Sequence, residues 1–395
     1  MKKLLRWLPQ ILTAVMAVWF ISTLQPPPDT TFAFNQFGEL PVVFNGRLKP
    51  MDSLARNSLL EIRERQTLDT EPWKDWDEDP RIISANEWLV NVMMNPAVAD
   101  AWPVFRVDNP DLITLLKLPE RNLAQHQDGK HYSWNQIAPA FDALNKEDSR
   151  VEKIEAVQRS AYERAVSKVF DRLMLYQELK NTLQPQDVPN WKQELTGYEA
   201  LIPAGSAAVR AQQAGQKFDQ NVFNAFADDI QQLSDMSQLS SPLAVPPSGG
   251  GDDWQRTGVV LLDAAKGGKI SPAVESYAAM IDAFRNGDAA AFNDALADYR
   301  ASLVPQFSPA LEKCRAEVFF NRMQPFYAAL IIYVLAGLLA VCSWFNLSET
   351  LRRSAVWLVG LAFLIHTTGL IYRMALEGRP PVTNLYSSAI FIGWG

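Results

Sequence analysis

The chain has 395 residues, a formal net charge of -7 and 48% hydrophobic residues. Its length is enough for two or more domains, and its acidic balance argues against nucleic acid as a partner. The two cysteines, Cys314 and Cys342, form no CxxC or CxxCH motif, which excludes a thioredoxin-like redox protein and a c-type cytochrome. On one continuous helix they would lie ~42 Å apart, so we predict that they do not pair.

Three apolar runs contain no Asp, Glu, Lys or Arg, at 8–24, 325–344 and 355–372. Each has about the ~20 residues that a helix needs to cross a bilayer. A fourth run begins near Ser388 and stops at Gly395, which is too short to satisfy its backbone in lipid. We therefore expect the sequence to be the front end of a longer protein.

Basic residues predict the orientation of these runs. Three of them precede the first run, and Arg352 and Arg353 follow the second, so both ends should be cytoplasmic. Residues 25–324 and the 373–387 turn then lie outside. A cleaved signal peptide is the alternative for the first run, but no A-x-A-like site follows it, so we favour an uncleaved anchor.

These assignments predict a mainly α protein with polytopic membrane helices and a large, mostly helical extracytoplasmic domain. The N-terminal anchor covers 1–26 and the extracytoplasmic domain covers 27–324. Residues 325–395 begin a membrane domain. A Pro/Gly/Ser-rich linker or long loop interrupts the outside domain near 238–257.

Within the outside domain, the first elements are indicated by local chemistry. Residues 41–44 and the Asn45-Gly46 turn predict a short extended segment or hairpin. A helix should follow, with Asp52 or Ser53 as its N-cap. Residues 72–145 are rich in Trp, Pro and Asn and predict short helices and loops.

The second half of the outside domain is predicted to be helical. Apolar spacing over 150–182 indicates one long amphipathic helix. Residues 272–303 predict two helices separated at Asn286-Gly287, and a further helix from about Ser308 should lead into the second apolar run.

His126 and His131 flank an Asp-Gly turn and have the spacing of a weak metal site. No cysteine or further histidine supports them, so we interpret this segment as a solvated loop. The sequence contains no G-x-S-x-G, H-E-x-x-H or phosphate-binding G-x-x-x-x-G-K-[ST] motif. The outside domain thus shows no recognisable catalytic pattern.

The third apolar run holds His366, predicted to lie ~9 Å from the outer end of its helix. An ionisable residue in a membrane segment is costly and usually faces a cavity, partner or cofactor. The ring could ligate haem iron, or it could hydrogen-bond to a neighbouring helix. Thr367 and Thr368 are expected to bond back to carbonyls one turn earlier.

Two arginines, Arg373 and Arg379, follow on the predicted outer side, where positive charge is less favoured. They could snorkel to lipid head groups or hold an anion such as a haem propionate.

The motif HTTGL (366–370), Arg373 and GRPPVTNLY (378–386), followed by an apolar run, resembles the start of the membrane domain of CcsA-type (ResC-like) cytochrome c biogenesis proteins. Residues 317–339 are similar to the lead-in of that domain. A weaker resemblance covers 40–56.

The resemblance implies haem as cofactor and a function in attaching haem to apocytochrome c at the outer face of the bacterial inner membrane. It also implies a ResB/CcsB-like membrane partner and a place in a holocytochrome c synthase complex. The residues assigned to haem by this resemblance are His366 (the candidate iron ligand), Arg373, Arg379, Asn384, Tyr386 and Trp394.

Two departures from the family pattern stand out. Ser387 occupies a position that is usually acidic, and the expected tryptophan-rich haem loop with its histidines should lie beyond Gly395. A competing interpretation is a membrane-anchored assembly or sensor protein that binds a partner outside and has no haem chemistry. Haem copurification would distinguish the two.

Overall fold

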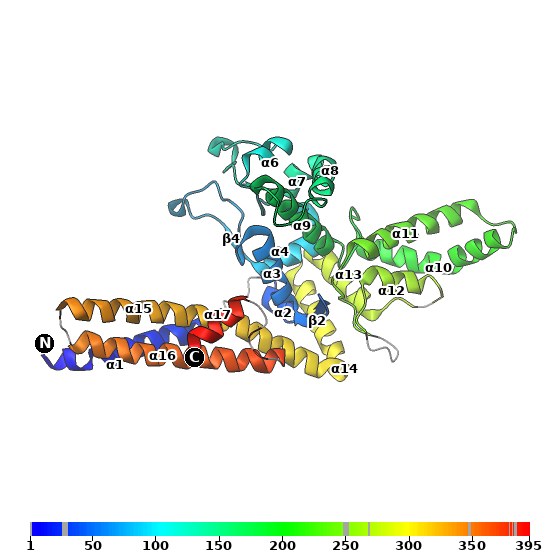
Figure 1. Ribbon diagram of the computed structural model, residues 1–395. Helices are drawn as coiled ribbons and strands as arrows, with labels where there is room; N and C mark the ends of the chain where they lie inside the picture. Colours follow the sequence, from blue (N-terminus) through cyan, green and yellow to red (C-terminus); the bar gives the residue numbers. More distant parts are fainter. Residues whose placement is uncertain are drawn as a thin grey trace. The chain divides into compact units, whose positions relative to one another are not determined.

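The computed structural model describes residues 2–25, 31–247, 253–267, 269–346, 349–378, 380, 382 and 385–395. The chain folds into two compact units, one comprising 29–311 and the other combining 1–28 with 312–395. Helices dominate both units (Figure 1). The mainly α class predicted from the sequence is confirmed.

The core of the 29–311 unit is built on three helices: α3 (Met51–Arg63), α4 (Ala85–Met94) and α9 (Ala161–Lys180). Each of them packs against the other two. Trp88 and Tyr176 are completely buried among them. Burying a large apolar side chain contributes about 1.5–3 kcal/mol, so this packing holds the surrounding short elements in place.

The predicted hairpin is present as β1 (Pro41–Phe44) paired antiparallel with β2 (Arg47–Pro50). Asn45 and Gly46 connect the strands, both with positive φ angles of 54° and 69°. This is the backbone that a two-residue hairpin turn requires, and Asn-Gly adopts it at low cost.

Helix α3 follows at once, but its predicted N-cap is wrong. Pro50 occupies the N-cap position, and Asp52 lies inside the first turn. The Asp52 carboxylate accepts hydrogen bonds from Arg56 Nε at 2.8 Å and from Asn86 Nδ2 at 3.1 Å. An i,i+4 partner on the same helix and a tertiary partner on α4 therefore use the carboxylate that a cap would have used.

The short helices and loops predicted over 72–145 are confirmed. Besides α4, they include α5 (Pro96–Ala99), α6 (Pro110–Leu115), α7 (Trp134–Ile137) and the start of α8 (Phe141–Val151), with 3-10 turns at Trp76–Glu78, Leu123–Gln125 and Ala138–Ala140.

Two antiparallel strand pairs were not anticipated: β3 (Thr67–Asp69) with β4 (Ile82–Ser84), and β5 (Phe105–Arg106) with β6 (His131–Tyr132). Strands of two or three residues are too short to show an alternating pattern.

The single helix predicted over 150–182 is wrong. Helix α8 ends at Val151, and α9 begins at Ala161. Ser160 and Glu163 form a capping box, in which the Ser160 side chain accepts from the Glu163 N–H and Glu163 accepts from the Ser160 N–H. This reciprocal cap starts a new helix inside an apolar pattern that looked continuous.

Four further helices follow: α10 (Trp191–Gln213), α11 (Gln220–Leu239), α12 (Thr257–Ala264) and α13 (Pro272–Arg285). Between α11 and α12 lies the 238–257 segment. Leu243 forms a β-bridge with Val43, and Val245 forms one with Gln255. These bridges attach the described residues of the segment to the fold, and its assignment as a linker or a long loop stays a prediction.

The helix break predicted at Asn286-Gly287 is confirmed, with Gly287 at a φ of 71° between α13 and α14 (Ala289–Met323). Phe307 interrupts α14 with a non-helical φ of -123°, close to the predicted helix start at Ser308. Gln324, with a φ of 40°, then separates α14 from α15.

The second unit contains α1 (Lys2–Thr23), α15 (Pro325–Asn346), α16 (Glu349–Glu377) and α17 (Leu385–Trp394). Helix α16 packs against α1, α15 and α17, and α1, α15 and α16 run side by side in Figure 1.

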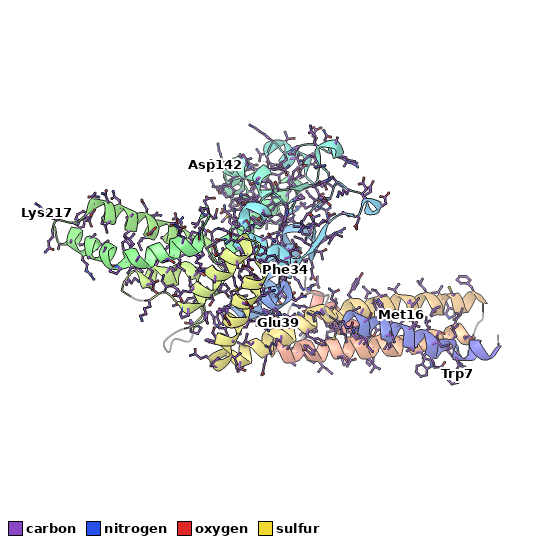
Figure 2. The ribbon with its side chains drawn as sticks, turned by 180° about the vertical axis from the view of Figure 1, so that it is seen from behind. Trp7, Met16, Phe34, Glu39, Asp142 and Lys217 are labelled. Carbon is purple, nitrogen blue, oxygen red and sulfur yellow. The ribbon has the colours of Figure 1, made fainter. Side chains whose placement is uncertain are left out.

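Small and branched apolar residues of α15 and α16 form the centre of this bundle, including Ile332, Ala336 and Leu358. Met16 of α1 packs against them, whereas Trp7 is 62% exposed; both are labelled in Figure 2.

The outward faces of α15 and α16 are also apolar, with Leu330, Leu338 and Leu364 more than half exposed. Among the described residues, two helical stretches are long and apolar enough to cross a membrane, one ending at Phe345 and the other spanning Glu349–Glu377. The apolar part of α1, Trp7–Thr23, is shorter. An apolar exterior around an apolar interior is typical of helices that face lipid.

Candidate functional site

His366 is the centre of the candidate site. It lies on α16 with 8% of its surface exposed. Its ring meets Phe326 and Tyr333 of α15 edge to face, with centroid distances of 5.6 and 6.2 Å. Two aromatic side chains of α15 therefore pack against the imidazole ring.

The imidazole of His366 lies close to the backbone of Ile390 on α17, and the predicted hydrogen bond to a neighbouring helix stays a prediction. Nε2 is buried and has no hydrogen-bond partner within the described residues. Leaving a buried polar atom unsatisfied costs about 1–3 kcal/mol, so this nitrogen is suited to accept a ligand.

Gly369, one turn beyond His366, explains how α15 comes so close. A Cβ atom on Gly369 would lie 2.8 Å from Cγ of Pro325 and 3.2 Å from Cε1 of Phe326. No side chain fits there without displacing α15. The glycine of the HTTGL motif is therefore required for the packing that places Phe326 against the histidine.

The two threonines beside His366 behave as predicted. Thr367 donates to the Phe363 carbonyl at 2.7 Å, and Thr368 donates to the Leu364 carbonyl at 2.8 Å. Thr367 Oγ1 also accepts from Nε1 of Trp394 at 2.8 Å. The fold thus brings the predicted residue Trp394 against Thr367, the residue that follows His366 in the sequence.

Trp394 is held on α16 by a second contact. Its indole stacks on Phe363, with 6.1 Å between centroids and 6° between planes. Together with the bond to Thr367, this stacking ties α17 to α16.

Arg373 is paired within its own helix. Its Nε lies 2.9 Å from Oε1 of Glu377, and the side chains are only 19% and 14% exposed. An external anion would have to compete with this carboxylate. Arg379, Asn384 and the side chain of Tyr386 lie outside the described part of the structure, so their predicted functions stay predictions.

Sequence reasoning missed Tyr372 and Phe320. Tyr372 donates to the Ala316 carbonyl at 3.1 Å and stacks on Phe320 at 5.6 Å. Phe320 in turn meets Phe326 at 6.2 Å. A continuous series of aromatic rings therefore leads from the last turns of α16 to His366. The close spacing of aromatic residues in the 317–339 segment was the available signal.

His126 and His131, in the 29–311 unit, do not belong to a group of metal-ligating side chains among the described residues. His126 stacks on Trp73 at 4.9 Å, and Nδ1 of His131 lies 2.5 Å from Oδ2 of Asp128. The solvated-loop interpretation suits the exposed His126 but is wrong for His131, which is partly buried in β6. Over the described ranges, no three His, Cys, Asp or Glu side chains are grouped to hold a metal ion.

Neither the buried Cys314 nor the exposed Cys342 forms a disulfide. The prediction that they do not pair is confirmed.

No family model matches the chain. The chain is similar to Protein NrfI of Wolinella succinogenes, with 21% identity over 370 residues. The alignment covers 91% of this chain and 33% of that protein, so the chain spans about a third of the length of this curated relative.

Proposed function

We propose that this chain acts in cytochrome c biogenesis, as a membrane protein that handles haem for attachment to apocytochrome c. The distant similarity to NrfI supports the biogenesis role, because it extends along nearly the whole chain. The resemblance of 366–386 to the CcsA type supports the haem chemistry. Within this proposal, a ResB/CcsB-like protein is the membrane partner, and the chain is part of a holocytochrome c synthase complex.

The single observation that carries the haem proposal is the unsatisfied Nε2 of His366. A neutral imidazole nitrogen of this kind is an axial ligand for haem iron, and the His366 ring is already packed against Phe326 and Tyr333.

The residues around His366 fit an aromatic macrocycle. Phe326 and Tyr333 offer ring edges beside the imidazole, and ring pairs of this geometry add about 0.5–1.5 kcal/mol beyond area burial. Haem, when bound, supplies the vinyl groups that the cysteine thiols of apocytochrome c attack.

Arg373 and Arg379, the two arginines proposed to hold the haem propionates, are not equally available. Arg373 is engaged by Glu377, so Arg379 is the better candidate. In the sequence it precedes Pro380 and Pro381, and a proline restricts the backbone of the residue before it, so we expect its side chain to start from a defined backbone. In this proposal both arginines lie at the outer interface, and residues 25–324 lie outside the cytoplasmic membrane.

The decisive experiment replaces His366 by glycine and adds imidazole to the medium. Loss of holocytochrome c with partial rescue by imidazole is expected if the ring ligates iron. The matched control is Thr368→Ala, two residues further along the same helix, because among the described residues the Thr368 hydroxyl bonds back to the Leu364 carbonyl of its own helix. His366→Ala protein that copurifies with haem showing an unchanged absorption spectrum would refute ligation.

A purely structural histidine behaves differently. His366→Gly would then lower the amount of folded protein, and imidazole would restore neither protein level nor cytochrome. Measuring protein level and haem content in the same preparation separates the two cases.

A further inference from the structure

A cavity of about 430 Å³ lies in the 29–311 unit, between the end of α3, the β5–α6 connection and the first turns of α9. Its apolar wall includes Val107, Leu112 and Val169. The charged residues that line it are Glu64, Arg106, Asp108, Arg164, Lys168 and Arg172. Four cations therefore face two carboxylates, in a chain whose net charge is negative. We call it the Glu64 cavity.

Glu64 is surrounded by positive charge. Its Oε1 accepts from Lys168 Nζ at 2.7 Å and from Arg172 at 2.8 Å. Its Oε2 accepts from Arg106 at 3.0 Å. The hydrogen bonds from Lys168 and Arg172 lower the pKa of Glu64 to about 2. One carboxylate cannot neutralise three cations.

One buried donor of this cluster is unpaired within the described structure, and two of its cations are partly exposed. Arg172 is 3% exposed, and its Nε has no hydrogen-bond partner among the residues described. The side chains of Lys168 and Arg106 are 58% and 38% exposed. Asp108 offsets the charge of Arg106, with its Oδ2 2.8 Å from the Arg106 Nε. Since a partly buried excess of positive charge is unfavourable, an added anion would stabilise the cluster.

The positive region extends beyond this cavity. A neighbouring cavity of about 350 Å³ shares Glu64 and Arg106 and adds Arg63, Arg65 and Lys74 to its lining, along with Asp69. A potential of one sign over adjoining concave surfaces raises the local concentration of oppositely charged ligands.

We propose that the Glu64 cavity binds a small ligand in which an oxyanion, carboxylate or phosphate, is attached to an apolar group. The oxyanion is held by Arg106, Lys168 and Arg172, and the apolar group packs on Val107 and Val169. This site is separate from the haem proposal, because none of its residues belongs to the unit that contains His366.

The test uses the full chain purified in detergent and titrated calorimetrically at low salt with acetate, hexanoate and inorganic phosphate. We expect hexanoate or phosphate to bind more tightly than acetate. Tighter hexanoate identifies an organic carboxylate, and tighter phosphate identifies a phosphate ester. Lys168→Gln should weaken binding about fivefold, the size expected for an exposed charge pair.

Two variants distinguish a binding site from a structural network. Glu64→Gln should bind the same probe more tightly, because the carboxylate that competes for the donors is removed. Lys192→Gln, an exposed lysine of α10, is the matched control and should leave affinity unchanged. Absence of binding by all three probes, or equal weakening by Lys168→Gln and Lys192→Gln, would overturn the proposal. If Glu64→Gln fails to fold, the comparison of Lys168→Gln with Lys192→Gln tests the proposal by itself.

Discussion

Replacing Gly369 by alanine tests the packing that supports the candidate site. The new Cβ would lie 2.8 and 2.9 Å from side-chain atoms of Pro325 and 3.2 Å from Phe326. Contacts below 3.0 Å force something to move, and the ring of Pro325 cannot change rotamer freely. We therefore expect α15 to shift away from α16 at this point.

The expected change in the free energy of unfolding is the sum of two opposing contributions. Overpacking of a close contact costs about 1–3 kcal/mol, whereas Gly→Ala inside a helix contributes about 0.5–1 kcal/mol in favour of folding. The net expectation for Gly369→Ala is a loss of roughly 0–2.5 kcal/mol. A Cβ atom added to Gly360, on the same helix, would meet nothing within 4 Å, so Gly360→Ala should show only the stabilising term.

The assay is denaturant unfolding of the detergent-solubilised chain, followed by tryptophan fluorescence, with both variants measured beside the parent protein. Haem content is measured in the same samples, because a displaced Phe326 would disturb the surroundings of His366. A Gly369→Ala protein as stable as the Gly360→Ala protein would refute the close-packing explanation.

The other predictions concern topology, charge and pH. An alkaline phosphatase fusion at about residue 200 should be active and one at about residue 350 inactive; an inactive fusion at 200 would refute the proposed orientation. Arg379→Gln should lower holocytochrome c yield at unchanged protein level, since a charge-assisted bond contributes about 1.5–3 kcal/mol; unchanged yield would leave the arginine at the lipid head groups. Because the pKa of Glu64 is lowered to about 2 from 4.5, its stabilising effect is present above pH 4.5 and lost as the pH falls toward 2. Unfolding midpoints of the parent and Glu64→Gln proteins should therefore converge over that range, and a constant difference would contradict this assignment.

Some elements were predictable because a few adjacent residues determine them. Asn45-Gly46 adopts the positive φ angles of a tight turn, and Gly287 ends a helix for the same reason. The apolar runs at 325–344 and 355–372 predicted helices because only an unbroken helix satisfies their backbone groups in lipid. The back-bonding of Thr367 and Thr368 likewise needs nothing beyond the helix that carries them.

Capping and strand pairing depended on contacts that the sequence does not display. Asp52 looked like a helix cap, but it lies inside the first turn, where Asn86 of α4 donates to its carboxylate from 34 positions away. The apolar spacing across 150–182 was compatible with one helix, and the cap at Ser160 divided it.

The two candidate sites were decided by tertiary structure. Residue type made His366 a candidate, but only the packing of α15 and α17 orients its ring and leaves Nε2 without a partner among the described residues. Glu64 and Arg172 are 108 positions apart, and nothing in either local sequence predicts that they meet. Side-chain chemistry is encoded locally, whereas burial and pairing depend on which distant helices pack together, because hydrophobic packing is not directional.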